Sequence, residues 1–136
     1  MKSEELMIGD WILHDGEPYQ IRQLGIYGEN RDGEDYPAVC VGKPKGIGLI
    51  IERNEIAPIL LTSEILQKNG FKESKYGEMI LDEELGISEI YLVLEESHDG
   101  EYYWWTVNNE IIAKIKSVHE LQHVLRLCGF NKKIEV

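Results

Sequence analysis

The residues of this chain that best fit a catalytic pattern are His119, Glu120 and His123, which form the sequence His-Glu-Leu-Gln-His. Two histidines one helical turn apart can bind one zinc ion, and the glutamate can hold the water that attacks a peptide bond. A catalytic zinc needs a third protein ligand, and no histidine follows His123. His14 and His98 are the upstream candidates. The motif supports a small zinc-dependent hydrolase as an alternative hypothesis.

The same residues belong to a helix that the sequence predicts over 117–129. Ser117 and Glu120 have the spacing of a capping box, and Gly129 is suited to the helix end. The residues at helical spacing on the apolar face are Val118, Leu121, Val124, Leu125 and Cys128. The polar face carries His119, Gln122, His123 and Arg126. We therefore expect a helix that packs on a sheet, with both histidines facing water and no metal or cofactor.

Composition limits the possible function classes. The 136 residues are 43% hydrophobic, which is enough for one domain or two small subdomains with a core. The net charge is -11, so direct binding to nucleic acid is disfavoured, because that binding depends on cationic side chains. The two cysteines, Cys40 and Cys128, are expected to be small core residues. No apolar signal or membrane-spanning segment is visible, which predicts a cytoplasmic protein without membrane contact.

The first half, residues 1–60, has the chemistry of a small β-subdomain. Alternating residues on both sides of Asp15-Gly16 predict a hairpin over 9–24. Residues 25–35 are rich in glycine and acidic side chains and are expected to form an exposed loop. Further strands are expected at 37–41, 47–51 and 55–60, the last at an edge because it contains Pro58. Five short strands predict a small bent sheet or an SH3-like barrel.

The second half, residues 61–136, predicts an antiparallel meander covered by helices. A short helix is expected over 62–70, capped by Thr62 or Ser63 and ended by Gly70. Strands are expected at 76–81, 87–95, 101–107 and 110–115, and the helix at 117–129 is expected to cover one face. The predicted fold class is therefore α+β, and the sequence leaves open whether the two halves share one core.

A run of four aromatic residues, 102–105, is the most unusual feature of the meander. It places large rings on both faces of one strand. Tyr103 and Trp105 are the candidate interaction surface, for a protein partner or for self-association. Packing in the core or between the halves is the alternative. Stacking with nucleic-acid bases has little support, because only Lys114 and Lys116 lie nearby in the sequence.

Three segments also carry a resemblance to other proteins: Ile8–Ile12, the run Ile56–Phe71 and Val118–His123. Together they resemble a group of small proteins from gut Bacteroidetes and their prophages or other mobile elements, a group with no established activity. The likeness spans most of the chain. It implies a bacterial, cytoplasmic protein, and it assigns no catalytic residue.

The function expected from these observations is that of a non-enzymatic protein-interaction or accessory (mobile-element) factor, which acts by contacting a protein. The partner is unknown. The zinc hydrolase centred on His119, Glu120 and His123 is the alternative from another class. A third hypothesis is an acidic mimic that blocks a DNA-binding protein, since the chain has 25 acidic and 14 basic residues.

Overall fold

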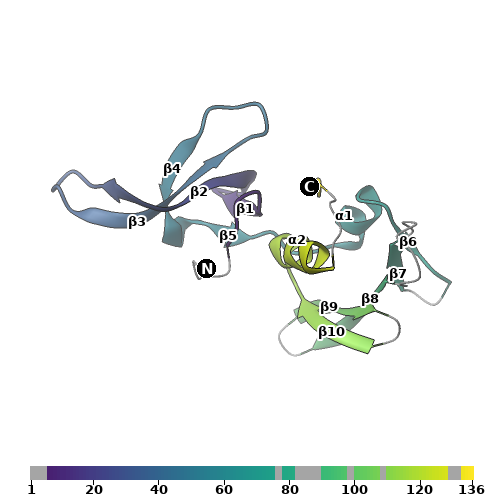
Figure 1. Cartoon of the computed structure of the whole chain (residues 1–136). Helices are drawn as coiled ribbons and strands as arrows, with labels where there is room; N and C mark the ends of the chain where they lie inside the picture. The colour runs from purple at the N-terminus through teal and green to yellow at the C-terminus, as the bar shows by residue number, and fades with distance from the viewer. Residues whose placement is uncertain (1–5, 76–77, 82–89, 98–99, 108–109, 129–132) are drawn as a thin grey trace. The chain divides into compact units, whose positions relative to one another are not determined.

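The computed structural model describes residues 6–75, 78–81, 90–97, 100–107, 110–128 and 133–136. The chain divides into two compact units, Met1–Ile59 and Leu60–Val136. Each unit contains a five-stranded antiparallel sheet, and the α-helices of the described residues lie in the second unit (Figure 1). The α+β class predicted from the sequence is confirmed.

The sheet of the first unit has the strand order β4-β3-β2-β1-β5 and is open, with β4 and β5 at its two ends. Its strands are β1 (Trp11–His14), β2 (Glu17–Glu29), β3 (Asp35–Gly42), β4 (Leu49–Glu52) and β5 (Ala57–Pro58), and a 3-10 helix (Arg53–Glu55) joins β4 to β5. The predicted hairpin is confirmed. Its turn places both Asp15 and Gly16 at positive φ, 50° and 77°, as a two-residue hairpin turn requires.

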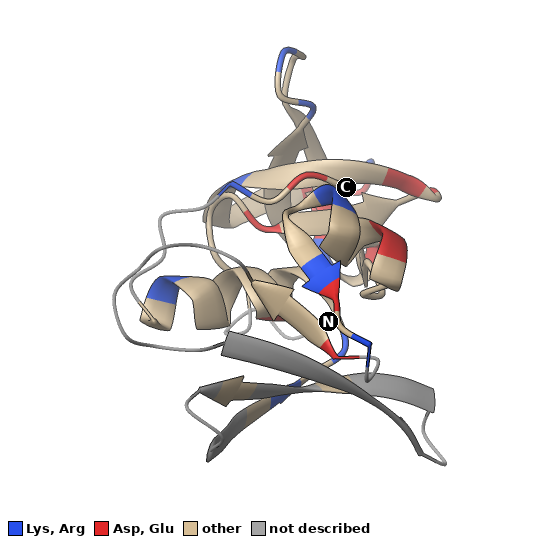
Figure 2. Cartoon of the chain, turned by 90° about the vertical axis from the view of Figure 1, so that its right-hand side faces the viewer, with Lys and Arg blue, Asp and Glu red and all other residues tan. Residues whose placement is uncertain are grey.

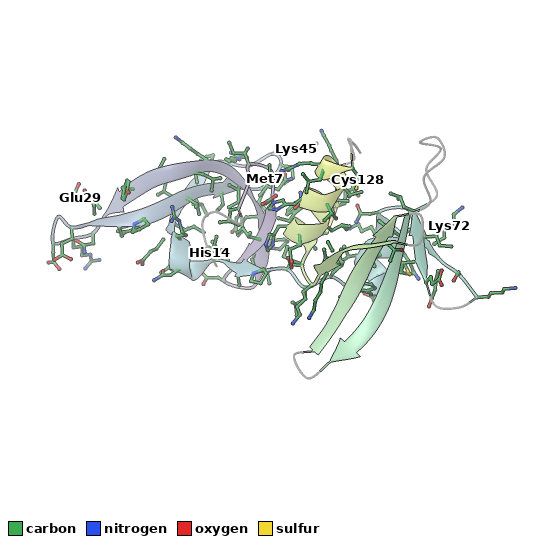
Figure 3. All side chains as sticks on the ribbon, turned by 60° about the horizontal axis from the view of Figure 1, so that its bottom comes forward. Met7, His14, Glu29, Lys45, Lys72 and Cys128 are labelled. Atoms are coloured by element: carbon green, nitrogen blue, oxygen red, sulfur yellow. The ribbon has the colours of Figure 1, made fainter. Side chains whose placement is uncertain are left out.

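The expected exposed loop at 25–35 is confirmed only for residues 30–34, because β2 continues to Glu29 and pairs with β3 as far as Asp35. Glycine is tolerated in this part of β2 because Tyr36 covers it. Gly28 lies opposite Tyr36, and a Cβ at Gly28 would collide with the Tyr36 ring. Cross-strand packing therefore compensates for a residue that weakens a strand in isolation. The two strands form an arm, with Glu29 at its end in Figure 3.

The core of the first unit lies on one face of this bent sheet. Tyr19 and Leu24 pack at its margin, and its buried members are Leu6, Ile12, Ile21, Val39, Val41, Ile51 and Ile56. Arg22 fixes the turn that leads into β4. Its Nη2 atom donates to the carbonyl oxygens of Lys43 at 2.6 Å and Gly46 at 2.7 Å. Two contacts therefore position β4: Arg22 holds the turn before the strand, and Ile51 within the strand is buried in the core.

The second unit has the strand order β10-β9-β8-β7-β6. The strands are β6 (Phe71–Glu73), β7 (Met79–Leu81), β8 (Ile90–Ser97), β9 (Gly100–Val107) and β10 (Glu110–Ile115), and the helices are α1 (Ser63–Lys68) and α2 (Val118–Leu127). Strand β6 was not predicted. Both helices lie on one side of this sheet (Figure 1). Among the described residues, the buried apolar side chains here include Leu66, Phe71, Met79, Ile115, Leu121 and Leu125.

Helix α1 begins at the predicted cap and also holds the final segment of the chain. Thr62 Oγ1 accepts from the amide of Ile65 at 3.2 Å, and the helix ends at Asn69. The buried Asn69 side chain donates to the carbonyl of Glu135 at 2.7 Å and accepts from its amide at 2.7 Å. Ile134 beside it is 3% exposed. Residues 133–136 are thus bound to the end of α1.

Acidic and basic residues are interspersed along the ribbon in the view of Figure 2. Within the described part of the chain, no helix has both the length and the apolar character needed to cross a membrane.

Candidate functional site

The Glu120 side chain of the His-Glu-Leu-Gln-His sequence is bonded to the backbone that precedes α2. Its Oε1 atom accepts from the amides of Lys116 and Ser117, both at 3.2 Å, and from the Ser117 hydroxyl at 2.8 Å. Ser117 Oγ in turn accepts from the Glu120 amide at 3.4 Å. The predicted capping box is confirmed. A general base must reach a metal-bound water, whereas this carboxylate closes the first turn of the helix.

The prediction that both histidines face water is wrong for His119. Its side chain is 5% exposed, and its Nδ1 atom lies 3.0 Å from Ser117 Oγ. Gln122, also assigned to the polar face, is 8% exposed. The buried face of α2 is rotated towards His119 and Gln122, so that Cys128, expected in the core, is exposed. Helical periodicity fixes which residues share a face, but the packing partners decide how far that face extends.

His119 and His123 lie one turn apart with their ring centroids at 5.7 Å in an edge-to-face arrangement. In the described parts of the chain, no group of three or more His, Cys, Asp or Glu side chains is arranged to hold a metal ion. His98 lies outside the described residues, and His14 belongs to the first unit. The Ser117 hydroxyl is not an exposed nucleophile either, because Ser117 is 2% exposed. The cluster is built as a helix cap with an adjoining buried imidazole.

The aromatic strand proves to be β9. Tyr103 is 4% exposed, so its side chain belongs to the interior and offers no open surface to a partner. The side chain of Trp105 lies outside the described residues, and its role in an interaction surface stays a prediction. Strand β9 lies inside the sheet, paired with β8 on one side and β10 on the other, which suits the buried Tyr103 ring.

A different surface, strand β4, carries exposed apolar side chains. It pairs with β3 alone in the sheet of the first unit, and its other edge ends the sheet. Leu49 is 45% exposed and Ile50 is 60% exposed, and Ile47, in the turn before the strand, is 92% exposed. Alternate residues of such an edge direct their backbone N–H and C=O groups away from the sheet. Strand β4 therefore combines free backbone hydrogen-bonding capacity with apolar side chains.

A cleft of about 450 Å³ lies at the end of β4, beside the arm formed by β2 and β3. Its lining combines apolar and charged residues, among them Glu29, Arg31, Tyr36, Ile50, Glu52 and Glu55. Three of these six are carboxylates and one is a guanidinium; with Arg53, which directly follows β4, acidic groups outnumber basic ones by three to two at this end of the strand. The turn at the other end carries Lys43 and Lys45, with Lys45 labelled in Figure 3. Opposite charges thus flank the apolar residues.

The opposite edge of the same sheet is protected. Strand β5 has only two residues, and one of them is Pro58, which cannot donate a backbone hydrogen bond. Strand β4 contains neither proline nor lysine. Sequence reasoning identified 47–51 as a strand but did not identify it as an edge, because edge position depends on strand order. The run Ile47-Gly-Leu-Ile-Ile51 lacks alternation, a pattern typical of a buried strand, so the sequence carried no signal of an exposed edge here.

No family model matches the chain, and no curated protein or solved structure proved similar to it. The resemblance to small proteins of gut Bacteroidetes therefore stays a prediction.

Proposed function

We propose that this chain is a non-enzymatic protein that acts by binding another protein, with strand β4 as the binding surface. The observation that carries the proposal is the exposure of Leu49 and Ile50 on an end strand of an open sheet. A partner strand that pairs with β4 satisfies the outward backbone groups and buries both side chains. Burial of apolar surface stabilises a complex by about 25 cal/mol per Å². Burial of these two side chains therefore favours binding of a partner strand to β4.

The first sheet, in this proposal, is of the SH3-like barrel type. Support comes from the strand order, in which β1 lies between β2 and β5, and from the 3-10 helix between β4 and β5. The long strand β2 pairs with β1 through its first residues and with β3 through the rest. Such folds host many functions, so the binding site is inferred from β4 itself.

The proposal also places the protein in the bacterial cytoplasm, as an accessory factor of the kind that the sequence resemblance implies. Direct contact with nucleic acid is not part of it, because the net charge of -11 opposes association with phosphate. The zinc hydrolase has less support, since Glu120 Oε1 is already bonded to two backbone amides and one hydroxyl.

Affinity capture with matched variants tests the binding surface. Wild-type protein, Ile50→Lys and the control Leu60→Lys are each incubated with a bacterial lysate, and each captured protein is then purified and titrated by calorimetry. Leu60 is 65% exposed and lies in the second unit. We expect Ile50→Lys to abolish binding and Leu60→Lys to leave it unchanged. Binding that is indifferent to Ile50→Lys would overturn β4 as the surface.

Zinc analysis of the untagged protein tests the alternative. Stoichiometric zinc that disappears on His119→Ala would overturn the non-enzymatic proposal, because it would show that the imidazole binds metal in preference to the Ser117 hydroxyl. Zinc below a tenth of an equivalent in both proteins is the expected result.

A further inference from the structure

Strand β4 has the properties of a self-complementary edge. Lys45 precedes its apolar residues and Glu55 follows them, and both side chains are exposed. When two identical strands pair antiparallel, the beginning of each lies beside the end of the other. The basic end of one β4 then meets the acidic end of the second. From this arrangement we infer that the protein that adds to β4 is a second copy of this chain, paired through β4 about a two-fold axis.

The inference rests on the proposed function, since it names the partner for the same edge. A two-fold interface uses the same patch on both copies, so the patch must complement itself. The charges at the two ends of β4 complement each other, and its exposed apolar side chains can pack against the same side chains of a second copy. Ile47, Leu49 and Ile50 provide exposed apolar surface on each copy.

Side-chain alternation restricts the register of the pair. Residues directly opposite each other on neighbouring strands project to the same face of the sheet. In β4, Leu49 shares a face with the buried Ile51, and Ile50 shares the other face with Glu52. Only registers that match these faces extend the sheet. Two of them keep three residues of each β4 paired: one places Ile50 opposite Ile50 of the second copy, and the other places Ile51 opposite Ile51.

Charge selects between the two registers. With Ile51 on the axis, Ile50 would lie opposite the Glu52 carboxylate of the second copy, an apolar group against a charge. With Ile50 on the axis, Leu49 lies opposite Ile51, and the three paired residues of each β4 are all apolar. Lys45, in the turn before β4, and Glu55, in the 3-10 helix after it, lie beyond the paired residues, at ends of opposite charge that fall on the same side of the axis. We therefore place Ile50 on the two-fold axis.

The interface is small, so the expected dimer is weak. Each copy contributes the four residues of β4, a length of roughly 13 Å at the rise of a β-strand. Interfaces at the low end of the size range belong to transient complexes. Analytical ultracentrifugation at protein concentrations from about 5 to about 500 micromolar should show a monomer–dimer equilibrium. The expected dissociation constant is on the order of 10 to 100 micromolar.

Charge reversal tests the pairing of the ends. Lys45→Glu or Glu55→Lys alone should raise the dissociation constant about tenfold, because each change replaces attraction with repulsion at both ends of the paired strands. The double variant Lys45→Glu/Glu55→Lys restores the complementarity and should recover most of the affinity. Recovery separates a cross-strand pairing from a loss of folding. Absence of recovery would overturn the charge complementarity of the two ends, and with it the second copy as the partner.

Cysteine cross-linking tests the axis. Ile50 lies opposite Cys40 on β3, so Ile50→Cys is made in a Cys40→Ser/Cys128→Ser background and treated with a mild oxidant or a short bis-maleimide. We expect a covalent dimer. Ile47→Cys in the same background is the control: at 92% exposure it is more accessible than Ile50 but lies away from the axis, and it should cross-link less. Equal or greater cross-linking at position 47 would overturn the inference.

The outcomes separate this inference from the proposed function. A chain that stays monomeric at all concentrations, yet binds a different protein in an Ile50-dependent way, overturns self-pairing and leaves the proposed function in place. A monomeric chain that also captures no protein through β4 overturns both. A dimer with the expected cross-link and charge rescue supports both.

Discussion

The substitution Ser117→Ala should destabilise the second unit more than an ordinary helix-cap mutation does. Loss of a serine cap costs about 1 kcal/mol. Ser117 is 2% exposed, and its hydroxyl also lies 3.0 Å from the buried His119 Nδ1 and donates to Glu120 at 2.8 Å. Loss of a partner for buried polar groups costs a further ~1 to 3 kcal/mol. The expected total is about 2 to 4 kcal/mol in the free energy of unfolding.

Thr62→Ala provides a matched control in the same unit, measured by the same urea titration and far-UV circular dichroism. Thr62 is an exposed cap with one hydrogen bond, to the amide of Ile65, so its loss should cost about 1 kcal/mol. Amide hydrogen exchange of α2 and α1 reports each helix locally. If Ser117→Ala costs no more than Thr62→Ala, the bond between Ser117 and His119 contributes nothing, and the cluster at the start of α2 was interpreted incorrectly.

Three further substitutions test the core, a turn and the bound final segment. Leu121→Ala, at 0% exposure, should cost about 2 to 5 kcal/mol by urea unfolding, whereas Leu127→Ala, at 86% exposure on the same helix, should cost less than about 0.5 kcal/mol. Gly16 has a φ of 77°, whereas Gly46 has no positive φ. Gly16→Ala should therefore lower the free energy of unfolding by about 1 kcal/mol more than Gly46→Ala does. Equal losses would contradict the turn geometry. Asn69→Ala should release residues 133–136, seen as faster carboxypeptidase digestion, and unchanged digestion would contradict the observed pair of bonds to Glu135.

Features that depend on neighbouring residues in the sequence were predicted well. The Asp15-Gly16 turn, the Thr62 cap and the Ser117 capping box are each determined by two to four residues, and each occurs as expected. A hydroxyl that caps a helix needs only the backbone of its own first turn. The same is true of a hairpin turn at positive φ. Each of these sequence signals therefore predicts its structure without knowledge of distant residues.

The errors concern features that depend on distant contacts. The segment 25–29 contains two glycines and was expected to be a loop, but Tyr36 on β3 covers Gly28 and completes the ladder. His119 was assigned to water because helical spacing places it on the polar face of α2, yet it is buried. Helical spacing alone does not show how much of a helix surface the rest of the unit covers. The open edge at β4 was missed for the same reason, because strand order places it at the end of the sheet.

Edge protection also explains why β4, and not an edge of the second sheet, is the expected binding surface. Strand β6 ends that sheet with the exposed charged side chains of Lys72 and Glu73, and β10 carries exposed Lys114. Charged side chains on an edge discourage pairing with another strand. Strand β5 contains Pro58, so three of the four edge strands contain residues that discourage pairing with a further strand. Strand β4 instead exposes Leu49 and Ile50, and we therefore propose strand addition at this edge.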